Sequence, residues 1–87
     1  MLLKIADNTV IETNNLISML IEKKKFPNTP DKPNPHWEND KQIWDYGFVV
    51  EFAMIGEIIF HSHIYNTKTE AETKLREFMG AVDANKN

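Results

Sequence analysis

Alternating apolar and polar positions dominate the second half of the chain. From residue 46 to residue 54 the even-numbered positions are strongly apolar, and this period of two predicts a half-buried strand. A second run repeats the pattern after Gly56, so we expect the two runs to pair as an antiparallel hairpin. One face of the second run carries Ile58, Phe60, Ser62 and Ile64, and the other carries Glu57, Ile59, His61, His63 and Tyr65.

The loop of this hairpin decides which faces of the two strands meet. A two-residue turn at residues 55–56 pairs Met54 with Glu57, whereas a three-residue loop at residues 55–57 pairs Met54 with Ile58. A shift of one residue turns every side chain of a strand to the other face. Burial favours the three-residue loop, because it keeps the apolar faces together. The same register predicts the pairs Phe52 with Phe60 and Phe48 with Ile64.

A helix follows the hairpin. The sequence from Thr67 to Glu70 matches a capping box, in which the hydroxyl of Thr67 accepts a hydrogen bond from the amide of Glu70 and the Glu70 side chain accepts one from the amide of Thr67. Gly80 is predicted to end the helix, and residues 83–87 are expected to form a frayed tail. The apolar stripe that we expect to face the sheet consists of Ala71, Leu75, Phe78, Met79 and Val82.

The N-terminal segment predicts a short hairpin of residues 2–6 and 9–12, with its turn at Asp7-Asn8. After a break at residues 13–15, the apolar run of residues 16–22 fits two structures. As a helix it would present Leu16, Ile17, Leu20 and Ile21 as a stripe; as a strand it would place Ile17, Met19 and Ile21 on one face. We favour the strand, because two closely spaced turn signals suit a meander.

Together these elements predict an α+β fold, an antiparallel β-sheet of four to five short strands packed on one face by a single C-terminal helix. We expect residues 1–87 to form a single small domain with a proline-rich loop at residues 23–42. A chain of this length builds one thin core at most.

Composition narrows the function classes. The chain has no cysteine, so neither a disulfide framework nor a thiolate zinc site can support the core. It has no apolar run long enough to span a bilayer and no signal peptide at its start, so we expect a cytoplasmic protein without a membrane partner. The net charge of −3 argues against a general nucleic-acid binder. The lysines at positions 23–25 beside Phe26 leave a weak single-stranded nucleic-acid binder as a second alternative.

The proline-rich loop is the first candidate site. Long loops in small domains are usually functional or disordered, and prolines lower the entropy lost when such a loop is ordered. His36, Trp37 and Trp44 lie in or beside this loop, and an aromatic side chain on a stiff loop is a common anchor for a partner. The alternative is that Trp37 folds back over the small core.

The pair His61 and His63 is the second candidate. Histidines two apart on a strand share a face, and the favoured register places Glu51 opposite His61, with His36 as a distant fourth group. Two histidines and a carboxylate suit a divalent transition metal with an open position. The alternative is that they are ordinary polar residues on an exposed sheet face.

The sequence contains no known catalytic motif, so we expect no enzymatic activity, no catalytic residue and no cofactor other than such a metal. The favoured function is a non-enzymatic binding or regulatory module, active as a homodimer, that engages a protein or small ligand through its loop and its uncovered sheet face. That face is expected to carry Val49, Glu51, Ile59, His61, His63 and Tyr65. The alternative is a metal- or ligand-binding protein built on His61 and His63.

Overall fold

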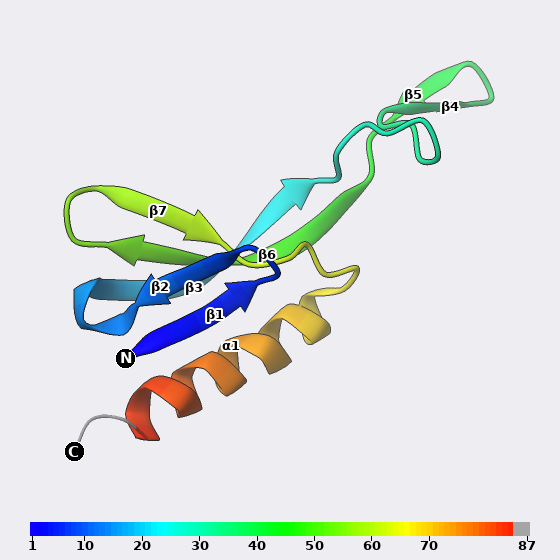
Figure 1. Ribbon diagram of the computed structural model, residues 1–87. Coiled ribbons are helices and arrows are strands. Elements are labelled where there is room, and N and C mark those ends of the chain that lie inside the picture. Colours follow the sequence, from blue (N-terminus) through cyan, green and yellow to red (C-terminus); the bar gives the residue numbers. More distant parts are fainter. Residues whose placement is uncertain (85–87) are drawn as a thin grey trace.

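Residues 1–84, the part of the chain that the computed structural model describes, contain seven antiparallel strands, a short 3₁₀-helix at Thr13–Asn15 and one long α-helix (Figure 1). The strands are β1 (Leu2–Ala6), β2 (Thr9–Glu12), β3 (Leu16–Lys25), β4 (His36–Glu38), β5 (Lys41–Ile43), β6 (Tyr46–Met54) and β7 (Ile58–His61). They form a central sheet in the order β3–β6–β7 and two separate hairpins, β1–β2 and β4–β5. The predicted α+β class is confirmed, with the strands distributed over three sheets.

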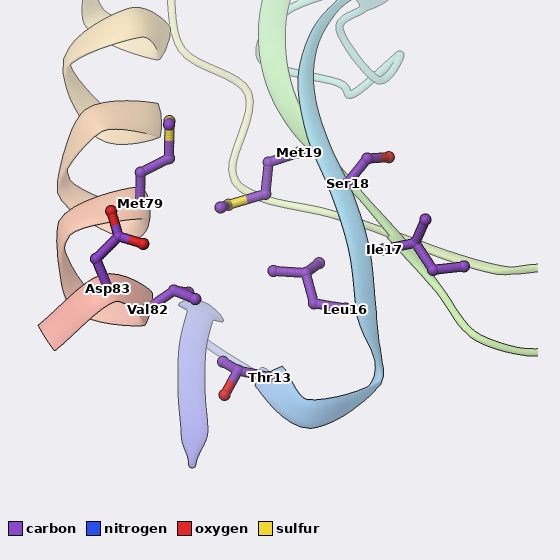
Figure 2. A pocket seen from close by; sticks show the side chains of 8 residues that line it. All are labelled: Thr13, Leu16, Ile17, Ser18, Met19, Met79, Val82 and Asp83. Atoms are coloured by element: carbon purple, nitrogen blue, oxygen red, sulfur yellow. The ribbon is translucent and has the colours of Figure 1, made fainter. Parts of the chain in front are cut away.

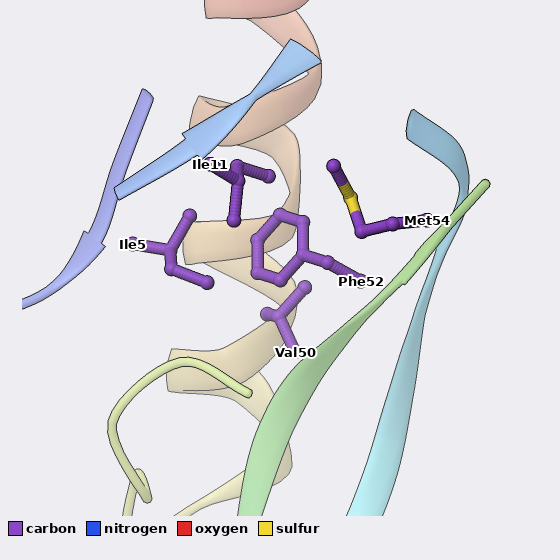
Figure 3. Close-up of a cluster of buried hydrophobic side chains, with 5 residues drawn as sticks. All are labelled: Ile5, Ile11, Val50, Phe52 and Met54. Atoms are coloured by element: carbon purple, nitrogen blue, oxygen red, sulfur yellow. The ribbon is translucent and has the colours of Figure 1, made fainter. Parts of the chain in front are cut away.

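The core lies on one face of the central sheet. Strand β6 occupies the middle of this sheet and contributes Val50, Phe52 and Met54, whereas Ile5 and Ile11 come from the β1–β2 hairpin (Figure 3). The helix α1 (Lys68–Ala84) covers the same face, where the rings of Phe52 and Phe78 meet edge to face at 5.3 Å between centroids. The hairpin and the helix therefore share one face of the sheet.

Residues 16–22 form a strand, as predicted, but not with the predicted face. Leu16 pairs with Met54 and Ser18 pairs with Ala53, so Ile17 is an extra residue that bulges out of the ladder. The bulge turns Leu16 to the face of Met19 and Ile21 and leaves Ile17 65% exposed. The expectation that Ile17 shares a buried face with Met19 and Ile21 is wrong for this reason.

The β6–β7 hairpin has the predicted three-residue loop. Met54 pairs with Ile58 and Phe52 pairs with Phe60, which confirms the register near the loop. Farther along, Phe48 pairs with Tyr65 instead of Ile64. Strand β7 ends at His61, and the amide of Ser62 still donates to the carbonyl of Val50 (3.0 Å). Between these contacts and the pair of Phe48 with Tyr65, the chain advances three residues from Ser62 to Tyr65 but only two from Val50 to Phe48. This extra residue ends the predicted alternation.

The helix begins where the capping box predicts it. The hydroxyl of Thr67 accepts a hydrogen bond from the amide of Glu70 at 3.1 Å, whereas the predicted return bond from the amide of Thr67 to the Glu70 side chain is not formed among the described residues. The predicted end at Gly80 is wrong: the helix continues to Ala84, and Val82 beyond the glycine is half-buried. Of the predicted tail, residues 83–84 are helical, and residues 85–87 lie outside the described residues.

The segment predicted as a proline-rich loop is partly regular structure. Strand β3 extends to Lys25, and a small hairpin of β4 and β5 follows. We call residues 26–45 the finger, because in Figure 1 they extend from the central sheet, far from the N-terminus and from the end of α1. The molecule measures 56 × 25 × 20 Å, and its Cα radius of gyration is 15.4 Å. A compact domain of this length has a radius of about 12 Å, so the finger accounts for an elongated shape. Among residues 1–84, no helix is long and apolar enough to cross a membrane.

Candidate functional site

The residues singled out by the sequence lie in three separate places. His36 and Trp37 lie in β4, and Trp44 follows β5, so these three belong to the finger. Glu51 and His61 are opposite each other on β6 and β7. His63 and Tyr65 follow β7, where the extra residue changes the direction of the chain. No single site therefore contains all the predicted residues.

The base of the finger is closed by the side chain of Asn34, which is 4% exposed. Its amide group donates to the carbonyls of Phe26 (2.6 Å) and Asp45 (3.0 Å) and accepts from the backbone N–H of Asp45 (2.8 Å). Its own backbone N–H donates to the side chain of Asn28 (3.0 Å). The side chain thus acts like an inserted peptide group that joins the ends of β3 and β6, and the long loop of the finger has a fixed base.

The tip of the finger is a tight hairpin turn. Glu38 pairs with Lys41, and Asn39 and Asp40 between them have positive φ angles of 49° and 63°. Two left-handed residues in a two-residue loop define a type I′ turn, which asparagine and aspartate favour. Trp37 lies one residue before this turn, opposite Gln42, and is 69% exposed. Within residues 1–84, no hydrogen bond or ring contact holds its indole, so Trp37 does not cover the core.

Two lysines lie over aromatic rings where the finger joins the sheet. The Nζ atom of Lys25 is 3.9 Å from the centre of the Trp44 ring, and that of Lys23 is 4.6 Å from the centre of the Tyr46 ring. Such contacts stabilise exposed aromatic groups by about 0.5–1 kcal/mol each. They hold Trp44 and Tyr46 in place and leave Trp37 as the unconstrained aromatic side chain of the finger.

His36 is placed between two carboxylates. Its Nδ1 atom lies 3.1 Å from Asp45 and its Nε2 atom lies 3.5 Å from Glu38. The two carboxylates lie at opposite nitrogens of the ring. They therefore cannot bind one metal ion together with a single nitrogen of His36. The arrangement instead connects β4 to the base of the finger.

The predicted metal site is not assembled. His61 lies opposite Glu51, as expected, but Nε2 of His63 lies 3.2 Å from the amide nitrogen of Asp7 and 3.4 Å from its carboxylate. Asp7 is in the turn between β1 and β2, on the helix side of the sheet. In the described part of the chain, no group of three or more His, Cys, Asp or Glu residues is arranged to hold a metal ion.

The sheet face opposite the helix is only partly uncovered. A Cβ atom on Gly47 would lie 2.6 Å from the carbonyl oxygen of Tyr65 and 2.8 Å from the ring of Phe26, and it would also meet the side chain of Ile64. These groups cover the finger end of this face, and Val49, predicted to be uncovered there, is fully buried. The exposed part lies nearer the β6–β7 loop and includes Ile17, Leu20 and Ile59.

A cavity lies beside the base of the finger. It has a volume of about 470 Å³ and is lined by residues that include Phe26, Pro33, Asn34, Asp45 and Tyr46. Its walls come from both the loop and the sheet, so its shape depends on the closure made by Asn34. Sequence reasoning missed this role of Asn34, and it missed the β4–β5 hairpin although Asn39-Asp40 is a recognisable turn signal.

Comparisons of the chain with protein-family models, with curated protein sequences and with solved structures yielded no match. The arguments for a function therefore come from the residues and their geometry. The most distinctive geometry is that of the finger, in which a fixed base and a tight turn present an exposed indole.

Proposed function

We propose that this protein is a small non-enzymatic binding module that anchors a partner protein through its finger, with Trp37 as the central contact. One observation carries the proposal: the 69% exposed indole of Trp37 lies on a hairpin whose backbone is fixed at its base and at its turn. Tryptophan is among the residues that dominate binding energy at protein interfaces.

The rigidity of the finger supports this role. Association costs free energy for every loop and side chain that it orders, so an anchor whose backbone is already ordered binds more tightly than one on a mobile loop. Polar residues surround the indole along the finger, and they include the exposed Glu38, Asp40, Lys41 and Gln42. An apolar anchor within a polar rim is the usual arrangement of an interface centre.

Several side chains that could act as a nucleophile or a base already have hydrogen-bond or ion-pair partners within the protein, which supports a non-enzymatic function. The hydroxyl of Ser62 accepts from the amide of Val50 (2.8 Å) and donates to the carbonyl of His63 (2.9 Å). The ring of His63 contacts Asp7, and the ring of His36 contacts Asp45 and Glu38. These groups stabilise turns and strand ends, and we assign none of them a catalytic role.

A protein partner fits the finger better than a nucleic acid does. Single-stranded nucleic acids bind where bases stack on open aromatic faces and lysines reach phosphates. Here Lys23 and Lys25 lie over Tyr46 and Trp44, so each of these rings has one face occupied by a lysine of the same chain. The acidic surplus of the chain also opposes a polyanion.

The test compares three immobilised proteins, the wild type, Trp37→Ala and Leu2→Ala, for capture from a lysate of the cells that make this protein. Leu2 is 71% exposed and lies in β1, outside the finger, so Leu2→Ala removes a similar exposed apolar group elsewhere. We expect a protein that the wild type and Leu2→Ala retain and that Trp37→Ala loses. If the three samples retain the same proteins, or none, the finger is not the binding site.

We propose in addition that the module works as a homodimer. Among residues 1–84, the exposed large apolar side chains outnumber the buried ones, and they include Ile17, Leu20 and Ile59 of the central sheet and Ile55 of the β6–β7 loop. A monomer seldom leaves so much apolar surface uncovered, and a chain of this size gains core from a second copy.

A further inference from the structure

Strand β3 forms an edge of the central sheet over its whole length. It contains ten residues and, in the described part of the chain, pairs only with β6. An unpaired edge exposes a row of backbone N–H and C=O groups that another strand can pair with. Proteins often protect such an edge with lysine, but here lysine occupies only positions 23–25, and the apolar half from Met19 to Ile21 has no such protection.

The ladder with β6 shows which backbone groups point outward. The amide of Phe26 donates to the carbonyl of Asp45 at 3.1 Å, across the β3–β6 pair. In an antiparallel pair, alternate residues point their N–H and C=O groups to the partner strand. The even-numbered residues from Ser18 to Lys24 therefore face β6, and the odd-numbered residues direct theirs to the free edge: Met19, Ile21, Lys23 and Lys25.

An apolar groove runs beside the same edge. Figure 2 shows Leu16 and Met19 on the side of β3 that faces α1, where they lie across from Met79 and Val82 of the helix. The groove has a volume of about 290 Å³, and Asp83 lies at its rim. A strand that pairs with β3 would cover this groove with the side chains of its helix-side face.

We propose that the edge of β3 pairs with β3 of a second copy of this chain, antiparallel and centred on Leu20, so that two central sheets join into one of six strands. This inference rests on the self-association proposed above and does not depend on Trp37. The sequence of β3 is self-complementary in this register: Met19 lies opposite Ile21 of the second copy, and Leu20 lies opposite its own counterpart.

Charge disfavours the neighbouring registers toward the lysine end of β3. Centring on Glu22 or on Lys23 would place that residue opposite its own copy, and like charges directly opposite destabilise a strand pair. Centring on Ile21 would place Leu20 opposite Glu22 and Met19 opposite Lys23, which sets the apolar centre of the strand against charges. Centring on Leu20 keeps Met19, Leu20 and Ile21 opposite one another, and the lysines then lie opposite Ile17 and Leu16. This register also keeps the lysines at positions 23–25 of the two copies apart and places them beside residues 15–17, near the end of the groove where Asp83 lies.

The first test is sedimentation equilibrium of the wild type, Leu20→Lys and Ile59→Lys. Leu20 and Ile59 are 42% and 54% exposed on the same face of the sheet, but Ile59 lies on the opposite edge strand. We expect wild type and Ile59→Lys to be dimers and Leu20→Lys to dimerise at least about tenfold more weakly. A monomeric wild type shows that self-association is wrong. If Ile59→Lys dissociates as readily as Leu20→Lys, the copies pack through their sheet faces, and only the β3 assignment is wrong.

The second test exploits the absence of cysteine from the chain. Because the backbone groups of Leu20 face β6, Leu20 and its counterpart form a non-hydrogen-bonded pair, with Cα atoms about 4.5 Å apart. That separation permits a disulfide. Under mild oxidation Leu20→Cys should form a covalent dimer, and Ile59→Cys should remain largely monomeric. Equal rates of crosslinking for the two variants would overturn the proposed register.

Discussion

Asn34 and Asp45 are joined by two hydrogen bonds between one side chain and one backbone unit. The side-chain oxygen of Asn34 accepts from the N–H of Asp45 at 2.8 Å, and its NH₂ group donates to the carbonyl of Asp45 at 3.0 Å. A residue from the middle of a loop thus completes the pairing of β3 and β6 at the point where both strands end. The orientation of the finger depends on this closure.

Replacing Asn34 with alanine should loosen the finger and leave the core intact. The change removes the partners of Asp45 N–H and Phe26 C=O, and an unsatisfied group of this kind costs about 1–3 kcal/mol. Hydrogen exchange should accelerate at residues 36–43 and stay slow in β6. The matched control is Asn28→Ala, which removes only the bond from the backbone N–H of Asn34 and should have a smaller effect. Equal effects of the two variants would contradict the role given to the Asn34 side chain.

Two glycines should respond in opposite ways to alanine. A Cβ atom on Gly47 would collide with the carbonyl oxygen of Tyr65, 2.6 Å away, whereas one on Gly80 would meet nothing within 4 Å. Gly47→Ala should lower the free energy of unfolding by about 1–3 kcal/mol, as overpacking does. Gly80→Ala should raise it by about 0.5–1 kcal/mol, because alanine is the better helix former. Chemical denaturation measures both, and a tolerated Gly47→Ala would show that the contact between β6 and Tyr65 is loose.

Ser62 should be a structural residue of the sheet. Its hydroxyl takes the place of a backbone acceptor for the buried amide of Val50 (2.8 Å), where the extra residue after β7 displaces the chain. Ser62→Ala leaves that amide unsatisfied and should cost about 1–3 kcal/mol in a denaturation experiment. Ser18→Ala, at an exposed position of β3, serves as the control and should change stability by less than about 0.5 kcal/mol. A neutral Ser62→Ala would refute this assignment.

Glu12 should make the stability of the N-terminal hairpin depend on pH. The N-terminal ammonium, 2.8 Å away, and the amide of Asn14 lower the pKa of its carboxyl group below the usual value of 4.5. A lowered pKa stabilises the fold above the ordinary carboxyl pKa, and this contribution disappears as the pH falls through the folded value. The thermal midpoint of Glu12→Gln should therefore lie below that of the wild type near neutral pH and approach it in acid. A difference that is independent of pH would argue against the ion pair.

The sequence allowed the local elements to be predicted because their signals are local. The alternation on β6, the three-residue loop and the Thr67 cap depend on neighbouring residues, and the structure confirms all three. The two register errors have a different origin. One extra residue interrupts the pairing at Ile17 in β3, and another does so after Ser62, beyond the end of β7. Groups far away in the sequence accommodate such a residue: the amide of Val50, for example, donates to the hydroxyl of Ser62. Alternation alone cannot locate such a bulge.

The same distinction between local and long-range signals applies to the candidate site, of which the sequence indicated only a part. The sequence singled out Trp37, and the alternation also grouped His61 with His63, which the displaced chain after Ser62 separates. The closure by Asn34 could not be seen, because it joins residues 26, 34 and 45 through one side chain. Four prolines within nine residues suggested an irregular loop and masked the short hairpin that follows them.

The affinity of the captured partner for Trp37→Ala tests the central claim most directly. Titration calorimetry with the purified partner should show at least about thirtyfold weaker binding than to the wild type, the loss typical of a hot-spot residue. Leu2→Ala should bind as the wild type does, and all three proteins should have the same thermal midpoint, since neither side chain is part of the core. Unchanged affinity of Trp37→Ala would contradict the account, because the partner would then bind without the exposed indole.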